Sequence, residues 1–562
     1  MRVSSIGNFF TSQKLEESKN QNYFNYVSLK PGMDRVSFSG NIKPYPINVD
    51  VETAEFVANS LSTSTSGHRA VYGSKVFNRD VVQLMTLGVA KYAKDTARQN
   101  GKEPLVLIGG DTRKATKESL DFVKDTLINQ GVNVLYIDKP VPTPLHALAT
   151  KEKNIDVAIL MTASHNPWED GGYNLVTKEG AIAPPSVTKK VAENMVQYAK
   201  EGNFTVNKTQ KGEATKFFPY EMYENTINSY NLIDWDKIAN SNISIYYDAL
   251  KGTGSNVFPQ LLKEYKIPFN EIDSGKKEGP NPTGANLIEV KEAILKDKNN
   301  LKIGLANDGD ADRFGIVDEK GNFIEPNDVL LLTAHHLSEN KGRTGAIIRS
   351  QATSSQLDIF AKNNDLKVIQ TPVGFKFIGE DIIELRKEGE DILVAGEESG
   401  GLTINKHIPE KDGIIALLLM LDLVATEKKP ISEILENIKK DLNTEFRAHS
   451  INKKLEKEED KAIVMSRMEA IYNDALEGKD SFGKNYKIDV ERTEENRNEM
   501  ERYKKGGDGV KLYLTDGSSV LVRKSGTEPK VKAYIEVANK DAQVANNTIK
   551  ELKEEVESIF TI

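Results

Sequence analysis

Residues 303–313 read Ile-Gly-Leu-Ala-Asn-Asp-Gly-Asp-Ala-Asp-Arg, so a short apolar run is followed at once by Asp308, Asp310 and Asp312. The apolar run predicts a buried strand, and the aspartates then occupy the loop at its carboxyl end. Residues two apart in such a loop can point to the same side, so the three carboxylates would repel one another unless a hard cation lay between them. The sequence therefore predicts a metal site.

Two other structures would explain an acidic loop. A solvated acidic turn is the simpler one, but three aspartates in strict alternation behind a strand favour the metal site. An EF-hand would place Glu319 at its twelfth position, yet its sixth position, where the sharp turn needs glycine, is Arg313. The flanks also predict strands rather than helices, so we exclude the EF-hand.

A unit of apolar strand, polar loop, amphipathic helix and second strand recurs along the chain. Three such units predict three related α/β domains with mixed, mostly parallel sheets. In these sheets ligands collect at the carboxyl ends of strands. The paired strands are expected at 105–108 with 134–137, 243–247 with 269–272, and 346–348 with 368–369.

The end of the chain predicts a different architecture. After a charged helical stretch, two strands are joined by Asp516-Gly517, a strong hairpin signal. A third strand and a last helix follow, so we predict an α+β domain that completes four domains. The segments are a helix at 453–476, strands at 510–514, 519–522 and 531–536, and a helix at 541–559.

The 562 residues exceed what one core accommodates, and their composition, 38% hydrophobic and 28% charged, is that of an ordinary globular protein. Residues 1–45 have no sustained period, which predicts a disordered extension. We place the α/β domains at 46–210, 211–322 and 323–440, and the α+β domain at 441–562.

Charge and cysteine content exclude several classes of function. The net charge of −8 argues against a nucleic-acid partner. No apolar run approaches the ~18 residues of a membrane span, and the first residues lack the core of a signal peptide, so we expect a cytoplasmic protein without a membrane partner. The absence of cysteine excludes disulfides, thiolate metal sites and a cysteine nucleophile.

Thr162-Ala163-Ser164-His165-Asn166-Pro167 follows the apolar run 157–161 and places a serine at a strand end, where a nucleophile belongs. A serine-capped turn closed by Asn-Pro is the alternative. The aspartate loop favours the nucleophile, because a phosphorylated serine would supply an anionic oxygen to Mg²⁺ beside the carboxylates. A Ser-His-Asp hydrolase is disfavoured, since no Gly-x-Ser-x-Gly turn surrounds Ser164 and His165 is adjacent to it.

Gly396-Glu397-Glu398-Ser399-Gly400-Gly401 follows a third apolar run. A carboxylate and a hydroxyl two residues apart could hold a vicinal diol of a sugar, with glycines allowing close approach. A glycine-rich turn with solvated glutamates explains the loop equally well.

Arg523-Lys524-Ser525-Gly526-Thr527-Glu528-Pro529 follows the hairpin of the last domain. Its two cations, two hydroxyls and free backbone N–H groups suit a phosphate dianion better than they suit an exposed basic loop. Two further turns, 66–69 and 371–376, add cations that would be unremarkable by themselves.

Five motifs in this order resemble the signature loops of the α-D-phosphohexomutase superfamily. The resemblance runs from about residue 60 to the end of the chain, and the set is far more specific than any one motif. It implies four domains around a central cleft, each donating one loop. The motifs are Thr-Ser-Gly-His-Arg at 65–69, Thr-Ala-Ser-His-Asn-Pro at 162–167, Asp-Gly-Asp-Ala-Asp-Arg at 308–313, Gly-Glu-Glu-Ser-Gly-Gly at 396–401 and Arg-Lys-Ser-Gly-Thr-Glu-Pro at 523–529.

The resemblance also implies roles for single residues. Ser164 would be a phosphoserine, with Arg69 facing the reacting phosphoryl group. Mg²⁺ would be held by Ser164, Asp308, Asp310 and Asp312. The substrate would be bound by Arg313, Lys376, Glu397, Ser399, His407, Lys411, Arg523, Ser525, Gly526 and Thr527.

The chain departs from the family pattern at Asn174, where a lysine usually stands ten residues past the serine as a candidate proton shuttle. We expect Lys178 or His165 to supply the missing function. Ala70 and Lys524 are smaller departures.

The implied activity is isomerisation of a hexose phosphate through a hexose 1,6-bisphosphate. The Gly-Glu-Glu-Ser loop and the stretch 407–413 are more similar to phosphoglucomutases than to phosphoglucosamine mutases, whose loop usually has glutamine after the first glutamate. We expect glucose phosphate first and mannose phosphate second, in a monomer or homodimer. A non-catalytic sugar-phosphate-binding homologue and a Mg²⁺-dependent phosphatase are the alternatives; intact Ser164 and aspartates oppose the first, and the sugar and phosphate loops oppose the second.

Overall fold

The computed structural model describes residues 46, 48–64, 66–202, 204, 211–275, 277–503, 509–525 and 530–561, and the backbone of 35–36. The prediction of a disordered extension over 1–45 lies almost wholly outside these residues. Within it, strand β1 (Arg35–Val36) pairs antiparallel with β7 (Ala214–Lys216) at the edge of the first sheet.

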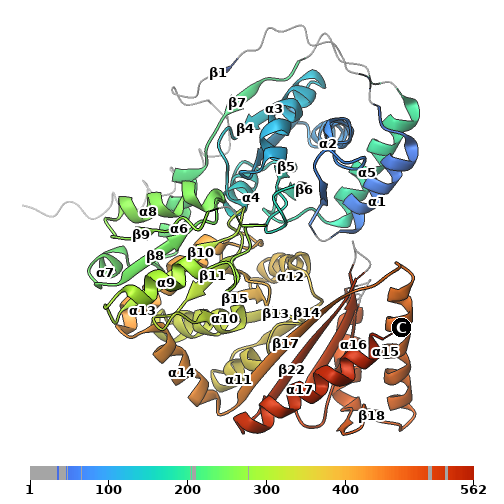
Figure 1. The fold of residues 1–562 in the computed structure, drawn as a ribbon. Coiled ribbons are helices and arrows are strands. Elements are labelled where there is room, and N and C mark those ends of the chain that lie inside the picture. The colour runs from blue at the N-terminus through green and yellow to red at the C-terminus, as the bar shows by residue number, and fades with distance from the viewer. Residues whose placement is uncertain are drawn as a thin grey trace, which may run out of the picture.

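The first domain, at the top of Figure 1, is a seven-stranded sheet in the order β1-β7-β4-β3-β5-β6-β2. Its central strands β4, β3 and β5 are parallel to one another. Strand β6 pairs antiparallel with β5, and β2 pairs antiparallel with β6. Alternate residues of β3 supply two cores: Val106 and Ile108 face one, and Leu107 faces the other. The elements are α1 Val51–Thr63, β2 His68–Val71, α2 Arg79–Gln99, β3 Leu105–Gly110, α3 Lys114–Asn129, β4 Asn133–Tyr136, α4 Thr143–Glu152, β5 Val157–Met161, β6 Asp170–Thr177 and α5 Pro185–Glu201.

The second domain is built on the sheet β12-β11-β10-β8-β9, in which β9, β8 and β10 are parallel and β11 and β12 antiparallel. Its elements are α6 Tyr220–Ser229, α7 Trp235–Ala239, β8 Ser244–Asp248, η1 Thr253–Asn256, α8 Phe258–Glu264, β9 Asn270–Glu271, α9 Ile288–Lys296, β10 Lys302–Asn307, β11 Phe314–Val317 and β12 Phe323–Ile324.

The third domain has the sheet β14-β13-β15-β16, with only β16 antiparallel. The three predicted strand pairs, β3 with β4, β8 with β9 and β13 with β14, are all confirmed as parallel neighbours. The elements are α10 Pro326–His335, η2 His336–Asn340, β13 Ala346–Ser350, α11 Gln356–Asn363, β14 Val368–Thr371, α12 Phe375–Glu388, β15 Ile392–Glu397, β16 Gly401–Ile404, α13 Gly413–Glu427 and α14 Ile431–Leu442.

The fourth domain is α+β, as predicted, with an antiparallel sheet β17-β22-β21-β20. The predicted helix over 453–476 begins only at Asp460, because residues 453 and 454 end the strand β17 and residues 455–459 form the connection to the helix. The elements are β17 Glu445–Lys454, α15 Asp460–Leu476, β18 Ser481–Phe482, β19 Tyr486–Lys487, α16 Val490–Glu501, β20 Gly509–Tyr513, β21 Ser519–Lys524, β22 Lys530–Asn539 and α17 Ala542–Ile559.

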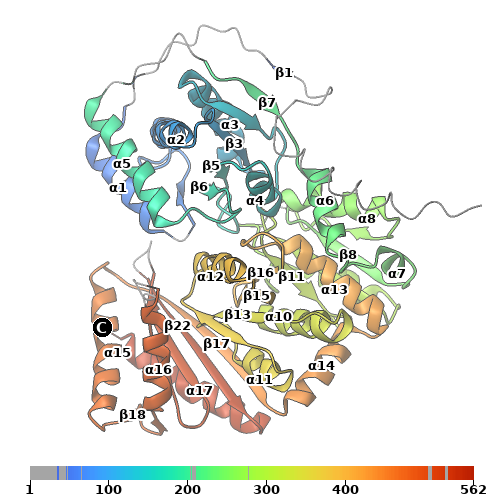
Figure 2. The ribbon, with the colours of Figure 1, turned by 180° about the vertical axis from the view of Figure 1, so that it is seen from behind.

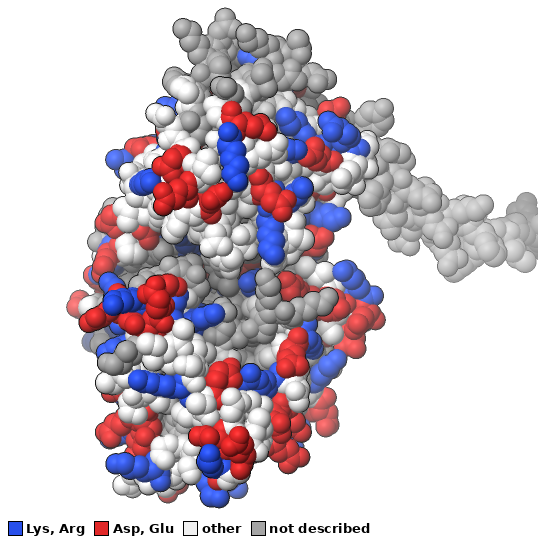
Figure 3. Space-filling view, turned by 90° about the vertical axis from the view of Figure 1, so that its right-hand side faces the viewer, with Lys and Arg blue, Asp and Glu red and all other residues white. Residues whose placement is uncertain are grey.

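The first three domains share one continuous hydrophobic core, whereas the fourth has its own. Seen from behind, α12 lies in the middle of the molecule, below the first domain and above the strands of the fourth (Figure 2). In the space-filling view the surface is hollowed at mid-height, between the first domain and the lower domains (Figure 3). Among the residues that the structure describes, no helix combines the length and apolarity needed to cross a membrane.

Candidate active site

The functional loops occupy the same topological position in each domain. Each connects a strand of the sheet interior to the antiparallel strand beside it: β5 to β6 for the serine, β10 to β11 for the aspartates, β15 to β16 for the sugar loop and β21 to β22 for the phosphate loop. The expectation of loops at carboxyl ends of strands is correct, but these loops close hairpins rather than lead into helices.

Ser164 lies at the tip of its loop with its side chain turned to the aspartates. Its Oγ donates a hydrogen bond of 2.7 Å to Asp308 Oδ2, and its residue is only 1% exposed. Its backbone has φ of 53°, a left-handed conformation that is costly for a residue other than glycine. The Ser164 N–H donates to Thr162 Oγ1 at 2.9 Å, which helps to hold this conformation.

Asp308, Asp310 and Asp312 form a buried carboxylate cluster, with one oxygen of each within 4.8 Å of the others. Burial and the neighbouring negative charges raise the pKa of Asp308 well above its usual range, and they raise that of Asp310 to about 6. Asp310 Oδ1 and Asp312 Oδ1 are buried and have no hydrogen-bond partner in the described part of the chain. Such orphaned anionic oxygens fit a hard divalent cation.

The rest of the cluster is firmly held by protein donors. Asp308 Oδ1 accepts from the backbone N–H groups of Asp312 and Arg313, each at 3.1 Å. Asp310 Oδ2 accepts from Thr143 Oγ1 at 2.8 Å and from Thr162 Oγ1 at 3.1 Å. The first domain therefore supplies hydroxyls to a carboxylate of the second, and no sequence motif pointed to Thr143.

Three cations surround the carboxylates. Arg69 lies half-buried on β2, and its Nε has no hydrogen-bond partner among the described residues. Burial lowers the pKa of Arg69, and the negative charges of Asp310 and Asp312 oppose this shift. Lys411 Nζ forms an ion pair with Asp312 at 3.2 Å. Arg313 follows the cluster directly and lies beside it, with its Nε 3.9 Å from Asp312 Oδ1.

His165 is the imidazole beside the serine. Its Nδ1 lies 3.3 Å from Ser164 Oγ. The positive charge of Arg313, followed by burial and the charge of Arg69, holds the pKa of His165 well below its usual range. The ring is therefore neutral at physiological pH and has a nitrogen able to accept a proton.

Asn174 and Lys178 lie in quite different places. Asn174 is buried on β6, opposite Leu160 of β5, and its Nδ2 donates to the carbonyl of Thr162 at 2.9 Å. Lys178 comes after the far end of β6, where Thr177 pairs with the first residue of β5, and it is exposed. The structure thus does not bring Lys178 to Ser164, which corrects the expectation that it could replace the missing lysine; antiparallel pairing carries it away.

The sugar loop carries Glu397 at the end of β15 and Ser399 in the turn that leads to β16. Glu397 is buried, accepts from the Gly374 N–H at 2.8 Å, and has a pKa raised to about 7 by burial and by the charge of Glu398. Ser399 is exposed. Glu398 is engaged elsewhere, since it accepts from Ser350 Oγ at 3.0 Å.

Lys376 lies in the first turn of α12, next to the Gly374 that binds Glu397. Its Nζ is 4.9 Å from the centre of the Phe377 ring. The structure therefore brings Lys376 to the edge of the sugar loop.

His407 corrects another expectation. It is fully buried, with Nε2 2.7 Å from Asp412 Oδ2 and Nδ1 3.0 Å from the hydroxyl of Tyr230. Asp412 in turn caps the N-terminus of α13 by accepting from the N–H groups of Ile414 and Ile415. His407 thus belongs to a polar network inside the protein, because both of its nitrogens are already engaged, and it cannot reach a substrate.

The phosphate loop is described only in part, because Gly526 and Thr527 lie outside the described residues. Arg523 is paired across the strands with Lys532, and the charge of Arg523 together with burial lowers the pKa of Lys532. Lys532 belongs to none of the five motifs; the alternation of Lys530 and Lys532 with apolar residues in the last strand was the signal that could have indicated it. Lys461 donates to the carbonyl of Ser525 at 2.9 Å and fixes the start of the loop.

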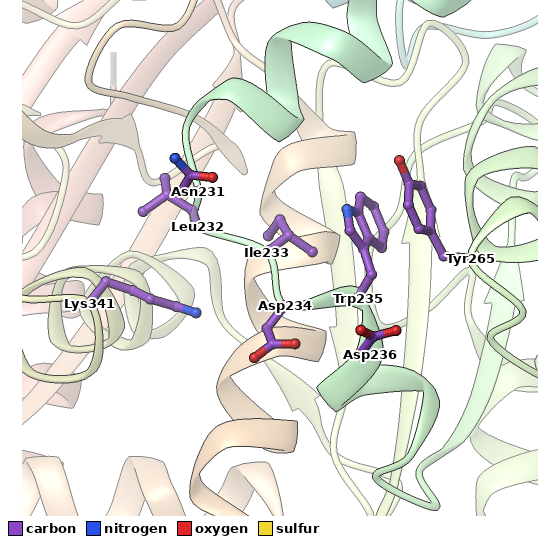
Figure 4. Close-up of a pocket in the computed structure, with 8 residues that line it drawn as sticks. All are labelled: Asn231, Leu232, Ile233, Asp234, Trp235, Asp236, Tyr265 and Lys341. Atoms are coloured by element: carbon purple, nitrogen blue, oxygen red, sulfur yellow. The ribbon is translucent and has the colours of Figure 1, made fainter. Parts of the chain in front are cut away.

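A pocket of about 450 Å³ lies elsewhere, where the second and third domains meet (Figure 4). The rings of Trp235 and Tyr265 stack at 3.9 Å on one side, and Lys341 reaches in from the other. None of the five motif loops contributes to it, so it is separate from the serine and the carboxylates. Its lining residues are Asn231, Leu232, Ile233, Asp234, Trp235, Asp236, Tyr265 and Lys341.

Comparison with known proteins agrees with this architecture. Models of the phosphoglucomutase/phosphomannomutase domains match in order: α/β/α domain I at 60–201, II at 221–321, III at 325–441 and the C-terminal domain at 486–554. The fold is thus that of the α-D-phosphohexomutase superfamily.

Similar proteins include a phosphoglucomutase/phosphomannomutase of Thermococcus kodakarensis, 27% identical over 83% of this chain and 93% of the relative. A phosphoglucosamine mutase of Francisella philomiragia is 29% identical over 66% and 79% of the two chains. In fold, the chain is similar to the phosphoglucomutase parafusin of Paramecium in its open form, with a TM-score of 0.69, 22% identity, and coverage of 89% and 95%. The chain belongs to the phosphoglucomutase/phosphomannomutase family, and it is an isomerase of the phosphohexomutase type.

Proposed function

We propose that the protein interconverts hexose 1-phosphate and hexose 6-phosphate through a phosphoserine at Ser164 and a hexose 1,6-bisphosphate, with glucose phosphate as the leading substrate. The observation that supports this most is the 2.7 Å hydrogen bond from Ser164 Oγ to Asp308, inside a cluster of three buried carboxylates. A serine so placed carries its phosphoryl group against the metal-binding oxygens.

The reaction balances without an external reagent. The bond between phosphorus and Ser164 Oγ breaks while the free sugar hydroxyl forms the new P–O bond, and the hydroxyl proton passes to a base. His165 is the base that the geometry favours, 3.3 Å from Oγ. The base passes this proton to the departing Ser164 Oγ. After the bisphosphate reorients, its other phosphoryl group is transferred to Ser164 Oγ, and the Ser164 proton passes through the base to the sugar oxygen that loses this group.

Asp308, Asp310 and Asp312 would hold Mg²⁺, whose charge would be shared with the phosphoserine oxygens and would stabilise the developing negative charge. Arg69 would face the same phosphoryl group. Positioning and charge neutralisation then supply most of the rate enhancement.

The other loops would hold the substrate. Glu397 would accept a hydrogen bond from one sugar hydroxyl, and Ser399 would donate one to another. Lys376, Arg313 and Lys411 would lie beside the sugar. The remote phosphate would be bound by Arg523, Lys532 and the loop that begins at Ser525.

Mannose phosphate is the second candidate, because hydrogen bonds from Glu397 and Ser399 to hydroxyls 3 and 4 of the sugar would not distinguish epimers at carbon 2. Phosphoglucosamine is more remote, since Glu398 stands where those enzymes usually have glutamine. The substrate is decided by measuring turnover of glucose 1-phosphate, mannose 1-phosphate and glucosamine 1-phosphate side by side, and the highest kcat/KM identifies it.

The phosphoserine is tested by intact-mass analysis after incubation with glucose 1,6-bisphosphate and Mg²⁺. We expect an adduct of ~80 Da, one phosphoryl group, on Ser164, and a loss of several orders of magnitude in turnover for Ser164→Ala. An unmodified Ser164, together with an active alanine variant, would refute the mechanism.

A further inference from the structure

Arg113 is a fully buried arginine at the start of α3, immediately after β3, and its only charged partner in the described part of the chain is Asp111. Its Nε donates to Asp111 Oδ2 at 3.0 Å, and Asp111 also accepts from Thr116 Oγ1. The guanidinium is thereby held in one orientation, with its other nitrogens pointing at the serine loop. A buried charge so anchored is expensive, so its remaining donors must be used.

Those donors all bind backbone carbonyls of the serine loop. Nη2 donates to the carbonyl of Ser164 at 2.6 Å and to that of Asn166 at 2.7 Å. Nη1 donates to the carbonyls of Pro167 and Asp170. The planar fork of arginine matches this arrangement, whereas the single ammonium of a lysine cannot span four carbonyls.

One of the four carbonyls that Arg113 binds belongs to a residue under strain. Ser164 has φ of 53°, and a left-handed non-glycine residue persists only where its surroundings enforce it. A charge-assisted hydrogen bond to the Ser164 carbonyl is a strong way to enforce it. In this conformation Ser164 Oγ points at Asp308.

We propose that Arg113 is a positioning residue for phosphoryl transfer: it holds the Ser164 backbone in the left-handed conformation that aims Oγ at the aspartate cluster. This inference rests on the proposed function. Its consequence is kinetic, because a nucleophile displaced by about 1 Å can lose on the order of 100-fold in rate while substrate binding at remote loops is unaffected.

The test compares Arg113→Lys with wild type and with Arg467→Lys as a matched control. Arg467 also donates to two backbone carbonyls, those of Ile559 and Thr561, but it lies on α15 of the fourth domain and binds no motif loop through them. Single-turnover phosphorylation of Ser164 by glucose 1,6-bisphosphate is followed by intact mass. We expect Arg113→Lys to slow it by about 10- to 100-fold with KM for the sugar phosphate within about twofold of wild type, and Arg467→Lys to behave as wild type.

A second measurement reports the loop itself. Trp168 lies over Arg113, with the guanidinium carbon 5.3 Å from the ring centre. In a Trp235→Phe background, which leaves Trp168 as the only tryptophan, Arg113→Lys should change the emission maximum while the melting temperature stays near wild type. Arg113→Ala should in turn recover phosphorylation rate when millimolar guanidinium is added, but not when methylammonium is added.

The outcomes separate the two proposals. If wild type accepts a phosphoryl group on Ser164 and Arg113→Lys accepts it equally fast, the positioning role is wrong and the proposed function stands. If Arg113→Ala keeps the wild-type circular dichroism spectrum but guanidinium restores nothing, the positioning role is again wrong. If wild type itself is never phosphorylated, the proposed function fails.

Discussion

Asn174 makes hydrogen bonds inside the protein that hold it in place. Its Nδ2 donates to the carbonyls of Leu160 at 3.3 Å and Thr162 at 2.9 Å. Its Oδ1 lies against Gly67, where a Cβ would come within 2.7 Å. The amide therefore binds the base of the serine loop through Nδ2 and packs its Oδ1 against Gly67, which precedes the strand of Arg69.

Replacement of Asn174 tests this link. Asn174→Leu removes both donors and leaves buried carbonyls unpaired, so we expect a loss of about 1–3 kcal/mol in stability and slower turnover. Asn174→Lys retains a donor, so it should fold and should keep or raise turnover. Thermal melts and steady-state kinetics of both variants measure this; a leucine variant as stable and active as wild type would show that the amide anchors nothing.

Glu397 predicts a pH dependence. Its pKa is raised to about 7 by burial and by Glu398, and only the ionised carboxylate accepts hydrogen bonds from sugar hydroxyls through both oxygens. We expect kcat/KM to fall as the pH drops through about 7, and this limb to vanish in Glu397→Gln, with a uniformly higher KM. An unchanged profile in the glutamine variant would assign the limb to another group.

The same raised pKa of Glu397 affects folding stability in the opposite direction to activity. The ordinary pKa of glutamate is 4.5, so between pH 4.5 and about 7 the unfolded carboxyl is ionised while the folded one still holds its proton. Stability contributed by Glu397 is therefore lost as the pH rises through this window. The difference in melting temperature between wild type and Glu397→Gln should accordingly move in favour of the variant as the pH rises.

Asp310→Asn should stabilise the protein in chelator, because it removes one of three mutually repelling buried charges. Asparagine is preferable to alanine here, since Asp310 Oδ2 accepts from Thr143 and Thr162 and a truncation would leave both hydroxyls unpaired. We also expect the rise in melting temperature caused by Mg²⁺ in wild type to be lost. A variant that still responds to Mg²⁺ would place the metal elsewhere.

Among the elements, the pairing of β5 with β6 decides which residues meet the serine. Gly172 is required there, because a Cβ would come within 1.8 Å of the Thr162 carbonyl. Leu160 faces Asn174, and Val157 faces Thr177. This register places Asn174 beside the serine loop and Lys178 at the opposite end of the strand, although the two residues are only four positions apart in the sequence.

The N-terminus of α13 gives a prediction about His407. Its ring connects Asp412 to Tyr230, so His407→Ala removes two hydrogen bonds, one of them to a carboxylate. This should cost about 1–3 kcal/mol in stability, with KM unchanged below the melting transition. Lys411→Ala is the contrast, because Lys411 lies beside Asp312 and its loss should raise KM. If His407→Ala raised KM as strongly without lowering the melting temperature, His407 would be a binding residue after all.

At the scale of the molecule, the fourth domain is joined to the third by polar contacts. Glu536 accepts from the N–H of Ser355 at the start of α11 at 3.0 Å, and Asp381 accepts from the hydroxyl of Tyr503 at 2.7 Å. Because hydrogen bonds exchange readily with water, this interface can open while both cores stay intact.

We therefore expect the fourth domain to unfold in a separate, earlier calorimetric transition. Glu536→Ala should lower that transition alone, since it leaves the Ser355 N–H without its acceptor. Glu557→Ala, on the outer helix α17, is the matched control and should change neither transition by more than the usual surface effect. A single transition shifted as a whole by Glu536→Ala would show that the four domains unfold together.

The sequence by itself determined the paired strands of the three repeated α/β units, the hairpin of the last domain and the strand-end positions of the loops that carry Ser164 and the aspartates, but it did not predict β17. It could determine these features because apolar periodicity and turn chemistry are local, and because several loops at strand ends must gather at one edge of their sheets. The aspartates at every second position of the loop 308–312 were sufficient to indicate a bound cation.

Only the tertiary structure decided which side chains complete the site. Thr143, Arg113 and Lys532 reach it from other strands and domains, while Lys178 and His407 are carried away by strand register and by burial. The sequence of a motif is the same whether its polar side chain faces a substrate or a buried partner. The difference lies in the pairing of distant strands and the packing of domains, where long-range contacts decide which hydrogen bonds are made.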